Sequence, residues 1–297
     1  MARQSFGRAT PWLFLAVPLL LLFLFLLLPY LLTFYYSITG ATIGKLLNVP
    51  LVGLRNFQAV LSSHAPDFVG VVLITAIFTA GTLIGSVALG TVLALALHTV
   101  SSGVRSALLA VYLIPWVIAA VIIGYTWRLI YDPAIGLANS VLGAVGVAPI
   151  DWLTTQGIAI FALIVANVWA GYGIVLLVVS GALANVPPNI ILAGQVDGAS
   201  YGRIVRRVIL PAIRPTFLLA ALVALVSGLN TFDLIYAMTR GGPLYHTETM
   251  ALEMYRLTAL KGNVGQGASV TVILFTVSLA LAVAYVIVWR REARKWS

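Results

Sequence analysis

Long apolar runs alternate with short polar segments along the whole 297-residue chain. A helix needs roughly 20 apolar residues to cross the hydrocarbon core of a membrane. Six segments reach that length, at residues 12–36, 68–97, 106–130, 157–183, 208–235 and 268–289. The second is long enough to require tilt or an interfacial end. The pattern predicts an all-α membrane protein with six transmembrane helices.

The first apolar run follows Arg3 and Arg8, as the apolar part of a signal peptide would. However, residues 12–36 form a much longer run than the roughly 7–15 apolar residues of a signal peptide. No small-residue cleavage site follows this run. We therefore expect a retained membrane helix and a single transmembrane domain over residues 1–297.

Basic residues are distributed unevenly between the two sides that alternating helices would create. One side carries both basic termini, Arg105 and the arginine-rich segment 185–215. On the other side, basic residues are spread over longer loops, and loop 131–156 has none. Lys and Arg concentrate in cytoplasmic loops, so we predict that both termini and segment 185–215 are cytoplasmic.

The composition excludes several functional classes. Only 8% of the residues are charged, against about 25% in an ordinary soluble domain. The net charge of +9 comes from loop residues without interleaved aromatic side chains, so we expect no nucleic-acid partner. The chain has no cysteine, no GxxxxGK(S/T) phosphate loop and no close His/Asp/Glu group. We expect neither a metal site nor catalytic residues.

Segment 185–215 is the main polar interruption and reads NVPPNIILAGQVDGASYGRIVRRVILPAIRP. Pro188 suits the first turn of a helix, and Asp197 with Gly198 suits a turn. Residues 201–209 then predict a second short helix. From composition alone, this segment is equally consistent with a basic loop against lipid headgroups and with a docking segment for a cytoplasmic partner.

Polar side chains inside spans are costly and usually face a cavity or one another. The fourth and fifth spans each contain such a cluster, namely Asn167, Trp169, Gly171 and Tyr172, and then Ser227, Asn230 and Thr231. Aromatic faces, amides and hydroxyls suit a sugar, whereas the alternative is hydrogen bonding that only holds the helices together. Asp233 lies near the predicted outer end, where we expect an interfacial role.

Glycines in the second span predict close helix contact. Gly81 and Gly85 are four residues apart, and Gly90 extends the same row. Small residues at this spacing let two helix backbones approach closely. The partner helix is either elsewhere in this chain or in another subunit.

Segment 185–215 resembles the EAA loop of ABC importer permeases, whose pattern is close to EAAxxDGAxxxxxFxxIxLPxxxP. The matching residues are Asp197, Gly198, Ala199, Ile209, Leu210, Pro211 and Pro215. Residues 232–247, FDLIYAMTRGGPLYHT, resemble the FDxIYxLTGGGPxxxT pattern of the carbohydrate-uptake branch, the maltose-type permeases. The resemblance covers nearly the whole chain.

The resemblance implies a type I ABC importer permease fold, with both termini cytoplasmic and a cytoplasmic coupling helix. The chain would be one of two different permeases in the cytoplasmic (inner) membrane of a bacterium or archaeon. Two copies of a cytoplasmic ATPase would dock on the permease pair, and an extracytoplasmic binding protein would deliver a sugar. ATP and Mg would bind to the ATPase, so this chain would hold no cofactor.

The resemblance also implies roles for individual residues. ATPase coupling would involve Leu192, Ala193, Gly194, Asp197, Gly198, Ala199, Arg203 and Pro211. Leu192 replaces the opening glutamate of the EAA pattern, and Gly194 replaces its second alanine, so docking would depend on apolar contacts and arginines. Family sugar-site positions match Asn167, Gly171, Gly228 and Thr231.

The solute and some alternatives stay open. Disaccharides, oligosaccharides and glycerol-3-phosphate enter cells through similar permeases. The absence of mid-span Lys or Arg favours a neutral sugar.

A stand-alone secondary transporter is the rival function, although no inverted repeat or buried acid–base relay is visible. An assembly protein is a further rival, disfavoured by the polar clusters. The irregular segment 240–267 fits a docking surface for the binding protein.

Overall fold

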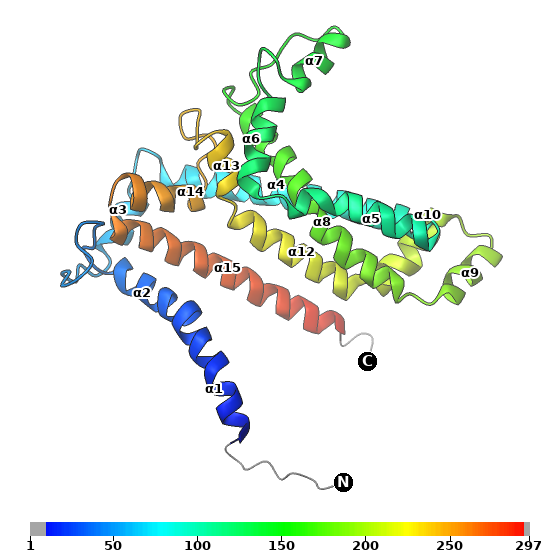
Figure 1. Cartoon of the computed structure of the whole chain (residues 1–297), viewed down its shortest axis with the longest axis horizontal. Helices are drawn as coiled ribbons and strands as arrows, with labels where there is room; N and C mark the ends of the chain where they lie inside the picture. Colours follow the sequence, from blue (N-terminus) through cyan, green and yellow to red (C-terminus); the bar gives the residue numbers. More distant parts are fainter. Residues whose placement is uncertain (1–9, 294–297) are drawn as a thin grey trace. The chain divides into compact units, whose positions relative to one another are not determined.

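The computed structural model describes residues 10–293, and helices dominate this range (Figure 1). Between those residues there are isolated β-bridges but no strand, which confirms the predicted all-α class. The described chain divides into two compact units, residues 10–63 with 253–273 and residues 64–252 with 274–293. Some of the terminal basic residues used to predict the orientation lie outside the described range. They are Arg3, Arg8, Arg294 and Lys295.

The first unit contains an apolar N-terminal helical stretch and the loops that follow it. Its helical elements are α1 (Thr10–Leu22), η1 (Phe23–Leu27), α2 (Leu28–Ser37), α3 (Arg55–Leu61), η3 (Arg256–Leu260) and the beginning of α15 (Val264–Ala293). The Asn56 side-chain amide donates to the carbonyls of Ser37 and Thr39, at 2.9 and 2.8 Å. These hydrogen bonds tie α3 to the end of α2.

The second unit carries both polar clusters and residues 185–215, the coupling segment. Its helical elements are α4 (Phe68–His98), α5 (Ser102–Val117), α6 (Ala120–Ile130), α7 (Leu137–Ala144), α8 (Ile158–Ala184), α9 (Pro188–Val196), α10 (Tyr201–Ile204), η2 (Val205–Ile209), α11 (Leu210–Ala212), α12 (Arg214–Leu229) and α13 (Asp233–Met238). Helix α14 (Met250–Tyr255) begins here and ends in the first unit.

Helices α4 and α8 form the centre of the second unit. An added Cβ at Gly81 or Gly85 would lie only 2.7 Å from Ile164 Cδ1 or 2.4 Å from Val168 Cγ2. The predicted glycine row therefore packs against α8 of the same chain. Buried apolar side chains extend this contact, including Val175 and others at less than 1% exposure.

Four described helical stretches are long and apolar enough to cross a membrane: Leu15–Ser37, Phe68–His98, Ile158–Ala184 and Val264–Arg290. Two bent pairs raise the total to six if each pair counts as one span. They are Ser102–Val117 with Ala120–Ile130, bent by 92°, and Tyr201–Ala212 with Arg214–Leu229, bent by 78°. The described residues thus contain four to six candidate membrane spans.

The predicted third span, 106–130, is not one continuous helix. Helix α5 ends at Val117, and the next two residues, Ile118 and Ala119, are extended, with ψ of 138° and 133°. Pro115, which lacks a backbone N–H, lies in the last turn before the break. The apolar pattern is continuous across this corner, so periodicity alone could not reveal it.

The predicted fifth span, 208–235, also contains breaks. Helix α12 begins at Arg214 and ends at Leu229, and the chain unwinds before α13 begins at Asp233. At this unwound point the Asn230 amide donates to the Val226 carbonyl, at 2.8 Å. Side-chain hydrogen bonds of this kind compete with continued helix. The chain therefore bends between α5 and α6 and unwinds between α12 and α13, both within the second unit.

Candidate functional site

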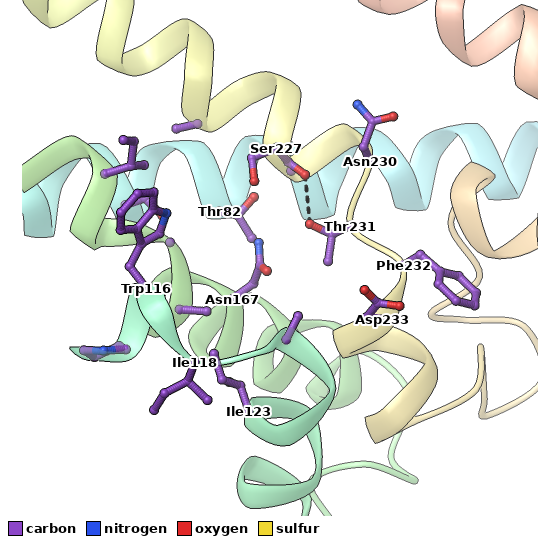
Figure 2. A pocket seen from close by; sticks show the side chains of 18 residues that line it. Thr82, Trp116, Ile118, Ile123, Asn167, Ser227, Asn230, Thr231, Phe232 and Asp233 are labelled. Atoms are coloured by element: carbon purple, nitrogen blue, oxygen red, sulfur yellow. Dashed lines mark hydrogen bonds between the residues drawn. The ribbon is translucent and has the colours of Figure 1, made fainter. Parts of the chain in front are cut away.

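A cavity of about 330 Å³ lies beside these two helix breaks. Figure 2 shows that side chains from α4, α5, α8 and α12 converge on it, together with the segment that leads into α13. Its polar and aromatic lining residues are Thr82, Ser86, Trp116, Asn167, Ser227, Asn230, Thr231, Phe232 and Asp233. Hydroxyl, amide and carboxylate groups thus share one space with two aromatic rings.

Most of the side chains predicted for the solute pathway meet at this cavity. The predicted residues that line it are Asn167, Gly171, Ser227, Gly228, Asn230 and Thr231. On α8, Asn167 and Gly171 are four residues apart and so lie on one helix face. On α12, Gly228 packs closely on α4, because an added Cβ would lie 2.9 Å from Thr82 Oγ1.

Two predicted solute contacts, Trp169 and Tyr172, are not among the residues that line the cavity. Both lie on faces of α8 other than the face of Asn167, since two or five residues do not complete a helical turn. Tyr172 is only 6% exposed and belongs to the core between α4 and α8. Trp169 packs edge-on against Trp127, with ring centroids 6.0 Å apart. Both side chains therefore pack within this chain, and their role in the solute pathway stays a prediction.

The sequence interpretation missed contributions from α4 and α5. Thr75, Thr79, Thr82 and Ser86 recur every three or four residues and are each at most 4% exposed, and Thr82 and Ser86 line the cavity. That spacing places them on one face of α4, a signal that was available in the sequence. Trp116 reaches the cavity from the end of α5, next to a corner that the sequence did not reveal.

Asp233 was expected near the outer end of the predicted fifth span, with an interfacial role that stays a prediction. The predicted span ran unbroken to residue 235. The chain instead unwinds after α12, and the Asp233 carboxylate lines the same cavity as Asn167 (Figure 2).

Several polar groups in the cavity have no partner within the described protein. Thr231 donates its hydroxyl to the Ser227 carbonyl at 2.9 Å, and the Asn230 amide likewise donates to its own helix. In contrast, the side chains of Asn167, Ser227 and Asp233 form no hydrogen bond among the described residues. These three groups are available to a solute.

The coupling segment ends its first helix with a Schellman motif. The Ala199 N–H donates to the Gly194 carbonyl, and the Gly198 N–H donates to the Gln195 carbonyl, both at 3.0 Å. This motif needs a left-handed residue after the helix, and Gly198 supplies it with φ of +71°. The Asp197–Gly198 pair thus sets the angle at which the chain leaves α9.

One contact packs the coupling segment on itself, and a second ties it to α4. Gly194 lies close to the buried Ile204, where an added Cβ would be 3.2 Å from Cγ1. The glycine that replaces the second alanine of the EAA pattern therefore allows α9 to pack tightly on α10. The Tyr201 hydroxyl donates to the Leu95 carbonyl at the end of α4, at 3.2 Å.

The outward surface of the coupling segment is apolar and basic. Ile190, Leu192 and Val196 of α9 are all exposed, and Val196 reaches 87% exposure. Ala193, Asp197 and Arg203 are also exposed, whereas Pro211 is half-buried in α11. The predicted helix 201–209 begins as α10 but continues as the wider η2 before α11.

Residues 77–294 match the family described as the inner membrane component of binding-protein-dependent transport systems. The chain belongs to this family. Among curated relatives, the trehalose/maltose transport system permease protein of Thermococcus litoralis is 32% identical over 275 residues, which cover 92% of each chain. The sn-glycerol-3-phosphate transport system permease protein of Agrobacterium fabrum is 28% identical, covering 93% of this chain and 92% of the relative.

A solved structure of the bacterial alginate ABC transporter, in complex with an alginate-bound periplasmic protein, contains a chain of the same fold. Its TM-score is 0.80 at 22% identity, covering 96% of this chain and 95% of that chain. The family match and this fold confirm the predicted resemblance to ABC importer permeases. A family member of this kind is a transport subunit, consistent with the expectation that it is not an enzyme.

Proposed function

We propose that the chain is one of two permease subunits of an ATP-driven importer for an uncharged sugar. The observation that carries this proposal is the cavity at the two helix breaks. Its described lining offers hydroxyls, amides and an exposed indole, Trp116, but no Lys or Arg. Such groups bind a sugar through ring stacking and hydrogen bonds. The trehalose/maltose relative supports the same class of solute.

The position of the cavity supports a mechanism in which the coupling segment moves its lining. Helix α12 has 16 residues and is roughly 24 Å long at 1.5 Å per residue. It begins at Arg214, at the end of the coupling segment, and ends at Leu229, beside the cavity. A displacement of α9 by a cytoplasmic ATPase would pass through α10, η2 and α11 to α12, and α12 would carry it to the solute site.

The proposal includes the remaining subunits and their sides of the membrane. A second permease would complete the cavity, and two copies of an ATPase would bind ATP and Mg and dock on the coupling segments. The exposed apolar residues of α9 and Arg203 would form this chain's share of the docking surface. Both termini and segment 185–215 would face the cytoplasm of a bacterium or archaeon.

An extracytoplasmic binding protein would dock on the opposite side. A second cavity of about 340 Å³, lined by residues that include Arg128, Asp151 and Pro243, would lie on that side. The loops around it are internally braced. The Asn139 side-chain carbonyl accepts the Trp152 indole N–H at 3.0 Å, and the Asp132 carboxylate accepts two backbone N–H groups, which lower its pKa. Braced, polar loops suit docking of a folded partner.

A glycerol-3-phosphate importer is the second candidate, because one relative carries that name. The lack of a basic side chain in the described lining disfavours it. Co-purification followed by uptake in proteoliposomes tests the choice. We expect a complex with a second permease and two ATPase copies, and ATP-dependent uptake of maltose or trehalose. Uptake driven by a proton or sodium gradient through this chain alone would refute the proposal.

Substituting Asn167 tests whether the cavity is on the transport path. Asn167→Ala removes unpaired amide groups from the lining, each worth about 0.5–1.5 kcal/mol when hydrogen-bonded to a solute. We expect uptake at low solute concentration to fall about fivefold. Thr126→Ala is the control, because Thr126 is an exposed residue of α6 that does not line the cavity. Equal uptake by both variants would remove Asn167 from the pathway.

A further inference from the structure

We propose that Asp233 sets the charge selectivity of the solute cavity. Its carboxylate would accept hydrogen bonds from solute hydroxyls and repel solutes that carry phosphate, carboxylate or sulfonate groups. This inference deepens the proposed function and depends on it for the identity of the solute, but not for the electrostatic effect itself.

The packing of α13 holds the backbone of Asp233 in a defined place. Asp233 is the first residue of α13, and the next two residues, Leu234 and Ile235, are at most 1% exposed. Helix α13 packs tightly on α6, where an added Cβ at Gly124 would lie 2.6 Å from Ala237 Cβ. The Asp233 side chain is itself exposed, and the packing of α13 fixes its backbone beside the cavity that it lines.

The carboxylate is the only charged group among the described lining residues. No ion pair or hydrogen bond joins Asp233 to another described side chain. The nearest basic residue along the chain after α13, Arg240, lies over the Tyr236 ring at 5.8 Å and does not line the cavity. The negative charge is therefore not neutralised by a described neighbour.

Such a charge acts differently on two classes of solute. A carboxylate that accepts from a hydroxyl forms a hydrogen bond roughly twice as strong as a neutral pair. Asn167 and Ser227 lie in the same cavity and can bond further hydroxyls, as Figure 2 shows by their convergence. An anionic solute instead meets a like charge with no Lys or Arg in the described lining to offset it. The arrangement favours uncharged polyhydroxy solutes.

The absence of cysteine from the sequence allows a direct test that requires no knowledge of the solute. Ser227→Cys places one thiol in the cavity, and Ser and Cys have similar shapes. The complete transporter in proteoliposomes is treated with a cationic methanethiosulfonate, the trimethylammonium-ethyl reagent, or with an anionic one, the sulfonatoethyl reagent. Mass spectrometry of this chain then gives the two labelling rates.

We expect the cationic reagent to be favoured, and Asp233→Asn to lower the ratio of cationic to anionic rates about fivefold. One carboxylate acting on two oppositely charged probes through a mostly aqueous space gives an effect of roughly this size. Asp233→Glu should keep the ratio. The control Asp67→Asn should not change it, because Asp67 caps α4 away from the cavity and asparagine is an equally good cap.

An unchanged ratio in a folded Asp233→Asn transporter would overturn the proposal, as would an equal change in the Asp67→Asn control. Asp233→Glu guards against misfolding, since a charge effect predicts a wild-type ratio there. Maltose and trehalose uptake by wild-type proteoliposomes, which carry neither Ser227→Cys nor a label, reports on the proposed function separately. If neither sugar is taken up but Asp233→Asn still lowers the ratio of cationic to anionic labelling rates, the proposed solute is rejected and the role of Asp233 is retained.

Discussion

A transporter that carries Gly198→Leu is expected to lose solute-stimulated ATP hydrolysis by about tenfold or more. Gly198 occupies the left-handed position of the motif that ends α9, with φ of +71°. A leucine there costs roughly 1–2 kcal/mol, which the chain relieves by changing its exit angle from the helix. Because α9 is the proposed docking element, a changed angle would misplace it against the ATPase. Solute-stimulated ATP hydrolysis is measured in proteoliposomes with the binding protein present.

Two variants separate the backbone effect from the effect of side-chain size. Gly198→Asn should retain most activity, since asparagine tolerates left-handed backbone better than other residues. Gly202→Leu should also retain it, because Gly202 lies in α10 with no atom within 4 Å of an added Cβ. Normal coupling in Gly198→Leu would show that the angle after α9 does not transmit the ATPase signal.

Gly90→Val is expected to produce the largest loss of stability. An added Cβ at Gly90 would lie 2.8 Å from Val175 Cβ and 2.9 Å from two backbone atoms of α8, Leu176 N and Tyr172 O. Backbone atoms cannot move aside as a flexible side chain can, so α4 and α8 must separate. We expect a destabilisation of about 3 kcal/mol or more, at the upper end of overpacking effects. Thermal unfolding of the detergent-solubilised complex measures it.

Gly181→Val is the matched control for this prediction. It introduces the same side chain into α8, where no atom lies within 4 Å of an added Cβ. Its unfolding temperature should stay close to that of the wild-type complex. If both valine variants unfolded at the same temperature, close packing at Gly90 would not be what holds α4 to α8.

The coupling segment shows how far local patterns reach. Pro188 at the first helical turn, and Asp197 with Gly198 at a turn, predicted a short helix and its end point, and the structure has α9 over Pro188–Val196. Such features depend on a few adjacent residues and their allowed dihedral angles, so they are readable from the sequence. The contact between Gly194 and Ile204 depends on how two helices fold back on each other, and no local pattern predicts it.

The cavity shows the opposite case. Asn167 and Thr231 were predicted because polar residues are rare in apolar spans, and they do line one space. Trp169 and Tyr172 were assigned to the same space because they are close in sequence, yet the helical rotation turns them toward the core. The spacing along α8 is sufficient to distinguish the two groups, because only residues three or four positions apart share a helix face.

Composition and short motifs were enough to predict the all-α membrane class, the family and the approximate positions of the apolar helices. Only the packing of the folded chain fixes where α5 turns into α6 and where α12 unwinds before Asp233. Apolar runs look the same whether a helix continues or bends, since lipid and protein interior favour similar side chains. The bends bring a tryptophan, a carboxylate and the α8 amide to one cavity, and such convergence depends on contacts between segments that are distant in the sequence.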